Sequence, residues 1–298
     1  HKAKIIGTGS YLPKRILSNA DLAKMVDTSD EWIFSRTGMR ERRIASKDEF
    51  TSTLGVKAAQ RAIESAGVDS DRIDLILVAT LTPDYVFPST ACLIQSELGI
   101  EAAALDIQAA CSGYIYGLSL AKAYIESGLY NTVLLVASEK LSSIVDYEDR
   151  STCVLFGDGA AACVISSEGT GLVLGDVVLG SDGSQADILL MPAGGSRNPA
   201  TGKTVDAKMH SIKMGGKEVF KHAVRRMESS SKECIEKAGL TEGDIRWLIP
   251  HQANIRIIDA IAKRFHVPSD RVVITVDRYG NTSASTIGIA LDELLTEK

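Results

Sequence analysis

The chain has 298 residues, of which 45% are hydrophobic, and a formal net charge of −5. This length and apolar content allow a large buried core, in one big domain or in two halves that share an interface. The negative balance gives no general attraction for nucleic acid, and no apolar run approaches the roughly 20 residues that span a bilayer. The N-terminus lacks the charged and apolar regions of a signal peptide, so we expect a cytoplasmic protein without membrane insertion.

The cysteine pattern excludes two further classes. The five cysteines are odd in number, widely spaced and free of CxxC pairs: Cys92, Cys111, Cys153, Cys163 and Cys234. Such spacing argues against a disulfide framework and against a zinc site. We therefore expect reduced thiols and no bound metal.

Strand-like and helix-like segments alternate along the chain. The apolar runs at 72–80 and 132–139 have the length and composition of buried strands, and residues 112–128 carry apolar side chains at helical spacing. This alternation predicts an α/β fold.

An internal repeat is the more informative feature. Residues 62–80 align without a gap to residues 234–252, with an offset of 172 and five of nineteen positions identical. Each copy predicts a helix that ends at Ala-Gly, a short polar turn and a buried strand. The alternative is that any two α/β units resemble each other because they share propensities.

The repeat places three polar residues at related positions. With a small shift it continues into the next turn of each half, where Cys111 and Asn281 lie at nearly equivalent strand-to-helix turns. His251 ends the repeated strand of the second half. If the halves pack about a pseudo-twofold axis, these three side chains meet near the centre.

These residue types together can perform acyl-transfer chemistry. A cysteine at a helix N-terminus is expected to have a lowered thiol pKa and to act as a nucleophile. His251 could serve as a hydrogen-bond donor, a base or a thiolate partner, and Asn281 could stabilise a negatively charged oxygen. Taken singly, each has a structural interpretation: a buried thiol, a satisfied polar group and a turn residue.

Seven stretches resemble one enzyme family: "DTSDEWIFSRTGMRERRIA", "FPSTACLIQ", "DIQAACSGYIYGL", "EDRSTCVLFGDGAAA", "GKEVFKHAVRRM", "IPHQANIRIIDA" and "RYGNTSASTIGIALDELL". The family is β-ketoacyl-acyl-carrier-protein synthase III, the initiating condensing enzyme of type II fatty-acid synthesis. The resemblance implies an α/β thiolase-like fold with duplicated halves in a five-layered αβαβα arrangement, usually as a homodimer. The nucleophilic Cys would lie in an N-terminal half, residues 1–170, and the His and Asn in a C-terminal half, residues 171–298.

The resemblance also implies a reaction. Cys111 would take an acetyl group from acetyl-CoA and release CoA, after which malonyl-acyl-carrier-protein would lose CO₂ and attack the acyl-enzyme to give acetoacetyl-acyl-carrier-protein. His251 and Asn281 would bind the thioester oxygen of the malonyl group. No cofactor or metal is implied, since acetyl-CoA is a substrate.

Six positions match residues that bind CoA in the family: Thr28, Trp32, Arg36, Arg150, Gly216 and Asn254. Trp32 and Arg150 would sandwich the adenine, and Arg36 would meet a phosphate. Phe87 matches a residue that reaches across the dimer to bound the acyl pocket. The alternatives are a half-buried anchor for Trp32, solvated ion pairs for the arginines and a core position for Phe87.

The acidic carrier protein requires a local basic surface on this acidic chain. Positions i and i+7 share a helix face, so Arg256 and Lys263 can form a basic stripe. The docking positions matched to the family are Lys221, Gln252, Ala253, Asn254, Ile255, Arg256, Lys263 and Arg264. The alternative is a solvated helix face.

The sequence departs from the family at its C-terminal end. It stops at "ALDELLTEK", whereas family members usually continue through a Gly-rich loop, so we expect the C-terminal half to lack the usual tail. Two other functions stay open: a same-fold condensing enzyme or acyltransferase with another starter or acceptor, and a non-enzymatic module that binds acyl-CoA or the carrier protein. A papain-like hydrolase is disfavoured by the duplicated α/β pattern.

Overall fold

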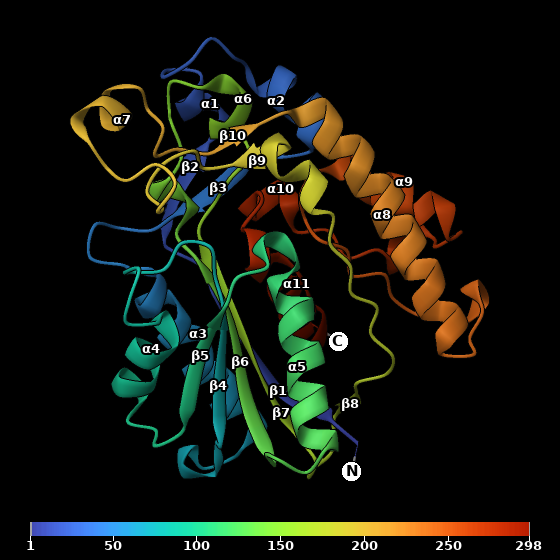
Figure 1. Ribbon diagram of the computed structural model, residues 1–298. Helices are drawn as coiled ribbons and strands as arrows, with labels where there is room; N and C mark the ends of the chain where they lie inside the picture. The colour runs from blue at the N-terminus through green and yellow to red at the C-terminus, as the bar shows by residue number, and fades with distance from the viewer. Residues whose placement is uncertain (1, 298) are drawn as a thin grey trace.

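The computed structural model describes residues 2–297. Within this range a six-stranded sheet has the order β5-β4-β6-β7-β1-β8, as Figure 1 shows. Its strands are β1 (Lys4–Tyr11), β4 (Leu75–Ala79), β5 (Ala103–Ile107), β6 (Thr132–Glu139), β7 (Gly159–Ser166) and β8 (Leu172–Val173). β4 runs parallel to β5 and β6, whereas β7 is antiparallel to β6 and β1, and β8 is antiparallel to β1.

The helices and the 3-10 turns (η) are α1 (Asn19–Leu22), α2 (Asp30–Thr37), α3 (Thr51–Ala66), η1 (Ser70–Arg72), α4 (Thr90–Leu98), η2 (Ala110–Ser112), α5 (Gly113–Glu126), η3 (Leu141–Ser143), α6 (Arg150–Cys153), η4 (Gly183–Ile188), α7 (Gly202–Asp206), α8 (Gly216–Lys237), η5 (Glu242–Asp244), α9 (Ile255–Arg264), η6 (Ser269–Arg271), α10 (Val276–Tyr279), η7 (Ser283–Ser285) and α11 (Thr286–Glu297). Two small two-stranded sheets pair β2 (Arg15–Ser18) with β3 (Glu41–Ile44), and β9 (Leu189–Leu190) with β10 (Lys213–Met214). No helix within residues 2–297 combines the length and the apolarity that a bilayer span needs.

Both faces of the six-stranded sheet are covered, which explains its continuous apolar strands. Every residue of β4, β6 and β7 is buried, as expected where helices pack on the two sides. Alternate residues of β4 face opposite layers: Ile76 packs in a cluster with residues of α3, and Leu77 in a cluster with residues of α5 and α11. The strands predicted at 72–80 and 132–139 and the helix predicted at 112–128 are therefore confirmed.

The predicted repeat is visible in the local structure. α3 and α8 are each followed by a left-handed glycine, Gly67 (φ 62°) and Gly239 (φ 67°), and then by η1 and η5, whose bounds differ by 172 residues. η2 leads into α5 as η7 leads into α11, and both turns begin at a residue with positive φ, Ala110 (44°) and Ser283 (52°). When η2 is matched to η7 residue by residue, Cys111 corresponds to Ala284, and Asn281 lies just before η7.

The second sheet that the repeat predicts is only partly formed within residues 2–297. Its two extended segments meet at one parallel bridge, Leu248 to Val272. The Leu248 amide donates to the Arg271 carbonyl, and the Val273 amide to the Leu248 carbonyl, each over 2.9 Å. Turns and helices lie close to the bridge in the sequence, since η5 and η6 precede its two residues and α9 and α10 follow them.

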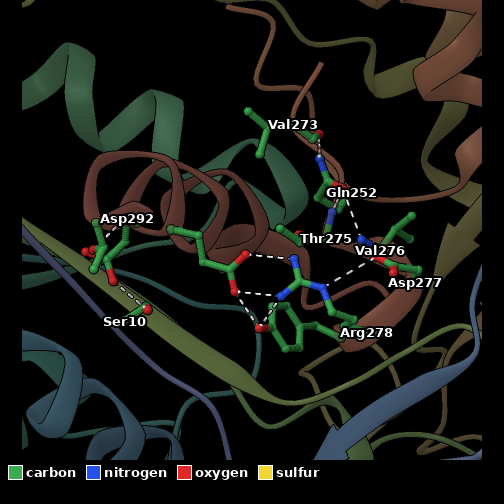
Figure 2. Close-up of polar contacts among 11 residues, drawn as sticks. Ser10, Gln252, Val273, Thr275, Val276, Asp277, Arg278 and Asp292 are labelled. Atoms are coloured by element: carbon green, nitrogen blue, oxygen red, sulfur yellow. Dashed lines mark hydrogen bonds and ion pairs between the residues drawn. The ribbon is translucent and has the colours of Figure 1, made fainter. Parts of the chain in front are cut away.

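Polar contacts fix the C-terminal half to the sheet and to itself (Figure 2). Asp292 of α11 accepts hydrogen bonds from the hydroxyls of Thr8 (2.8 Å) and Ser10 (2.6 Å) on β1. Arg278 donates two hydrogen bonds to Glu293, of 3.1 and 2.8 Å. These contacts hold α11 against β1 and α10 against α11.

The close approach of two backbone segments at Gly157 allows the packing of α10 to be tested. An added Cβ there would lie 2.4 Å from the Tyr279 carbonyl oxygen, which the backbone cannot relieve without moving α10. We expect Gly157→Ala to lower the free energy of unfolding by about 2 kcal/mol or more, measured by chemical denaturation.

Gly175→Ala is the matched control, because an added Cβ there meets nothing within 4 Å and the change should stay within about 0.5 kcal/mol of neutral or stabilise slightly. Equal stability of the two variants would contradict the close approach of the two halves.

Candidate active site

Cys111 lies in the turn η2, between the end of β5 and the first residue of α5. The turn is pressed between β4 and η7: a Cβ on Gly113 would meet the Cβ atoms of Ala79 at 2.9 Å and Ala284 at 3.3 Å. Glycine at 113 therefore lets the helix start close to both neighbours. The Cys111 side chain is half-buried there.

The environment of the thiol differs from the sequence expectation. Burial raises the pKa of the Cys111 thiol, and the nearby Glu139 carboxylate raises it further. A hydrogen bond from the Ser283 hydroxyl, with Oγ 3.6 Å from Sγ, acts in the opposite direction. The predicted lowering of this pKa at a helix N-terminus is thus outweighed, because the thiolate loses hydration.

Asn281 is held by both its backbone and its side chain. Its amide N–H donates to the Leu155 carbonyl (2.9 Å), and its carbonyl accepts from the Gly157 amide (3.1 Å). The side-chain Oδ1 accepts from the Ser283 amide at 2.8 Å. Because Oδ1 is occupied, the amide is oriented, and Nδ2 is left as a donor with no partner among the described residues.

His251 is fixed by a hydroxyl of the same C-terminal turn. Its Nδ1 lies 2.6 Å from Thr286 Oγ1, and that hydroxyl also bonds to the Ser283 carbonyl at 3.1 Å. Burial lowers the pKa of His251 to about 4, so the ring is neutral near pH 7. The hydroxyl of Thr286 has one proton, so it serves only one of these two acceptors. When that proton goes to His251 Nδ1, the ring proton sits on Nε2 and can be donated to a ligand; when it goes to the Ser283 carbonyl, Nδ1 carries the ring proton and donates to Oγ1.

The segment 281–286 therefore links the three predicted residues. It supplies Asn281 itself, contacts Cys111 through Ser283 and contacts His251 through Thr286. Ser283, Thr286 and the buried Glu139 were not predicted from the sequence. The hydroxyl-rich run "NTSAST" was the available signal for the first two.

A second cluster forms around the indole of Trp32. The guanidinium carbons of Arg36 and Arg150 lie 4.6 and 4.8 Å from its ring centroid, and Arg150 also donates to the Asp27 carbonyl at 2.7 Å. An adenine that stacks between the indole and a guanidinium needs these two planes to be about 7 Å apart, which is twice the usual contact distance. Arg150 would therefore have to withdraw before an adenine could enter.

Other predicted CoA positions lie on the surrounding loops and helix ends. The Thr28 hydroxyl is buried and has no partner among the described residues. Asn254 caps α9 by accepting from the Arg256 amide (2.8 Å) and donates to the Arg36 carbonyl (3.0 Å). Gly216 is the exposed first residue of α8. Thr28 precedes α2, and Asn254 ties α9 to the end of that helix.

Phe87 is a surface residue. Its side chain is 84% exposed, and the preceding Tyr85 and Val86 are 62% and 91% exposed. The alternative that Phe87 belongs to the core is therefore wrong for this chain.

The predicted docking residues differ in exposure and in their partners. Arg256, Lys263 and Lys221 are exposed, although Arg256 donates to the Ser35 carbonyl (2.9 Å) and Lys221 pairs with Glu218 (3.9 Å). Arg264 forms ion pairs with Glu228 (2.6 Å) and Glu242 (3.3 Å). Ala253 and Ile255 are half-buried against apolar clusters.

Gln252 requires a correction. Its side chain is 0% exposed, with Nε2 donating to the carbonyls of Pro250 and Val273 and Oε1 accepting from the amides of Thr275 and Val276, as Figure 2 shows in part. It cannot present that side chain to a docked protein. It instead holds the loop after His251 against the next extended segment.

Comparison with known proteins identifies the family. The sequence profile of 3-oxoacyl-[acyl-carrier-protein (ACP)] synthase III matches residues 105–183, and its C-terminal profile matches residues 235–298. The chain is 62% identical to a β-ketoacyl-[acyl-carrier-protein] synthase III of Chlamydia caviae, covering 99% of this chain and 88% of that one. The enzyme of the same name from Caldanaerobacter subterraneus is 53% identical, and the match covers 98% of this chain and 88% of that one.

Solved structures agree. The crystal structure of 3-oxoacyl-[acyl-carrier-protein] synthase III from Aquifex aeolicus superposes with a TM-score of 0.87 at 46% identity, covering 99% of this chain and 91% of that one. The chain belongs to the β-ketoacyl-[acyl-carrier-protein] synthase III family, the initiating condensing acyltransferases of type II fatty-acid synthesis. The predicted thiolase-like fold class is confirmed, and these names match the initiating synthase and not the alternative functions.

The state of His251 can be tested by its titration. Because burial holds its pKa at about 4, we expect its ring carbon signal to stay constant from pH 8 down to about pH 5 and to shift only below that. Carbon-13 NMR of labelled histidine provides the measurement, and His251→Gln assigns the signal by its loss. A midpoint near the ordinary value of about 6.5 would show that the ring is hydrated.

Proposed function

We propose that this protein condenses an acetyl group from acetyl-CoA with malonyl-acyl-carrier-protein, with Cys111 as nucleophile and with His251 and Asn281 as oxyanion donors. The observation that supports this most is the segment 281–286, which contacts the Cys111 thiol and fixes the orientation of both donors. A nucleophile beside two neutral donors is the arrangement that acyl transfer followed by enolate formation requires.

The reaction then divides into two steps. In the first, the Cys111 sulfur forms a bond to the acetyl carbon, and the bond from that carbon to the CoA sulfur breaks. In the second, malonyl-acyl-carrier-protein loses CO₂, and its thioester oxygen takes the negative charge while His251 Nε2–H and Asn281 Nδ2–H donate to it. The resulting carbanion attacks the acetyl carbon, and the Cys111 sulfur leaves. Thiol, imidazole and amide suffice, so no cofactor is needed.

CoA binding would reorganise the cluster around Trp32. The adenine would stack on the indole after Arg150 leaves its place over the ring, and Arg36 would pair with a phosphate. The unpartnered Thr28 hydroxyl would gain a partner from the nucleotide. Gly216 and Asn254 would line the pantetheine path.

The acidic carrier protein would dock on the exposed side of α9. Arg256 and Lys263 lie on one face of this helix. Both are exposed, and neither is in an ion pair among residues 2–297. Lys221 on the adjacent α8 extends this basic surface. Arg264 would contribute less, because two glutamates already engage it.

A second copy of the chain would cover the exposed apolar segment at Tyr85, Val86 and Phe87. Three consecutive exposed apolar side chains are costly in water, and β5 is an open edge of the sheet. In such a homodimer Phe87 would bound the partner's acyl pocket. A role in fatty-acid synthesis supports a cytoplasmic location for the protein.

Labelled substrate tests the assigned roles. With radiolabelled acetyl-CoA and malonyl-acyl-carrier-protein, the parent protein should form labelled acetoacetyl product, and Cys111→Ala should form no acetyl-enzyme while still releasing CO₂ from the malonyl group. The His251→Ala, Asn281→Ala double variant should still accept acetyl label, whereas its decarboxylation should fall by about 100-fold or more.

These variants serve as mutual controls, because each should lose one half of the reaction and keep the other. Condensation by Cys111→Ala at the parent rate would refute the nucleophile assignment. Unchanged decarboxylation in the double variant would refute the role of the two donors.

A further inference from the structure

Glu139 is a buried carboxyl group for which the reaction above has no use. It is the last residue of β6 and is 0% exposed. No lysine or arginine forms an ion pair with it in the described part of the chain, although a buried charge usually has such a partner. Oε2 instead accepts hydrogen bonds from the hydroxyls of Thr80 (3.1 Å) and Thr82 (2.6 Å) and from the amides of Leu81 (3.1 Å) and Thr82 (3.2 Å).

The other oxygen of this carboxyl group can accept further hydrogen bonds. Oε1 has only a longer contact with the Leu81 amide, 3.3 Å. Burial raises the pKa of Glu139, whereas the Ser283 side chain acts to lower it, and the Ser283 hydroxyl lies 3.6 Å from Cys111 Sγ. The turn η7, which carries Ser283, packs on both β6 and η2, so the serine stands between Glu139 and Cys111.

The fold holds this serine between the two groups. Ser283 is 1% exposed, and its φ of 52° is strained for a residue with a side chain. The turn η7 packs against both η2, which carries Cys111, and β6, which ends at Glu139. A strained position kept by packing on both sides indicates a requirement for this placement.

We propose that Glu139 receives the proton of Cys111 through the Ser283 hydroxyl when Cys111 attacks the acetyl donor. The Ser283 hydroxyl donates to Sγ at rest, so it first turns its proton toward Glu139. The S–H bond then breaks and an O–H bond forms on Ser283, whose original proton passes to Glu139. The sulfur then displaces CoA, whose thiolate takes a proton from solvent. When the condensation releases Cys111 as a thiolate, Glu139 returns the proton along the same path. Ser283 acts on the reacting sulfur directly and Glu139 acts through Ser283; both roles rest on the proposed nucleophilic role of Cys111.

The surrounding charges support this path. Burial raises the pKa of Glu139 to about 7, so the carboxylate can both take and return a proton near neutral pH. The other ionisable groups nearby are engaged elsewhere: Lys140 Nζ donates to the carbonyls of Ser46 and Glu49, the Asp158 carboxylate accepts from Ser142 and Ala45, and His251 Nδ1 is bonded to Thr286.

A purely structural role for Glu139 predicts the opposite change in the reactivity of Cys111 when the carboxylate is neutralised. If the carboxylate only braces the loop 80–82, its charge disfavours the Cys111 thiolate, and neutralising it should make the thiol more reactive at neutral pH. If it accepts the proton, neutralising it should make the thiol less reactive there.

The test is the rate constant of acetyl-enzyme formation from acetyl-CoA, followed by rapid quenching and intact mass between pH 5.5 and 9.5. For the parent we expect the rate to rise with a midpoint near pH 7. In Glu139→Gln the rise of the rate near pH 7 should disappear, and acetylation should be slower by about 10-fold or more at pH 7.5. At the alkaline end of the range its rate should approach that of the parent.

Ser283→Ala should show the same change with the carboxyl intact. Ser285→Ala is its matched control, because Ser285 belongs to the same turn but bonds only to Thr282, and it should keep the parent profile. This pair decides the question even if Glu139→Gln fails to fold.

An unchanged or faster reaction at pH 7.5 in Glu139→Gln, or equal profiles for the two serine variants, would overturn the proposal. Failure of the proposed function would look different: the parent itself would take up no acetyl group, or Cys111→Ala would still be labelled.

Discussion

The active-site arrangement depends on the docking of the segment 280–286 against the N-terminal half. The Asn281 backbone pairs with Leu155 and Gly157 over 2.9 and 3.1 Å, and two glycines permit the approach. Gly280 adopts φ 65° and ψ −156°, a conformation open essentially to glycine alone, and Gly157 lies directly against the Tyr279 carbonyl. Asn281, Ser283 and Thr286 are placed by this one contact, so a shift of the segment would displace the contacts to Cys111 and His251 together.

Removal of water from this site drives its ionisable groups toward their neutral forms. Burial raises the pKa of Glu139 to about 7 and that of Cys111, and it lowers the pKa of His251 to about 4. The consequences for stability have opposite signs: the cost of ionising Glu139 grows as pH rises from its ordinary range to about 7, whereas the cost of protonating His251 grows as pH falls from about 6.5 to about 4. A neutral site keeps its hydrogen-bond donors available for the negative charge that the reaction creates.

Features with a local signature could be predicted from the sequence. The strands β4 and β6, the helix α5 and the repeated helix and turn follow from apolar periodicity and from Ala-Gly helix ends. The grouping of Cys111, His251 and Asn281 followed from the repeat. Other features depend on which groups meet in three dimensions: the hydroxyl contacts of Ser283 and Thr286, the burial of Gln252 and Glu139, the stacking of two arginines on Trp32 and the raised thiol pKa. Residue type and spacing do not determine these, because each arises from contacts between segments distant in sequence.

Amide hydrogen exchange at Asn281 and Gly157, followed by NMR, tests the docking of the segment 280–286 most directly. Their two N–H groups form the hydrogen bonds that join the halves. If this contact is the constraint on which the site depends, both amides should exchange only through global unfolding, with opening free energies equal to those of the slowest amides in β6 and β7. Opening free energies far below the global value, with β6 and β7 still protected, would show that the segment detaches by itself and would contradict this account.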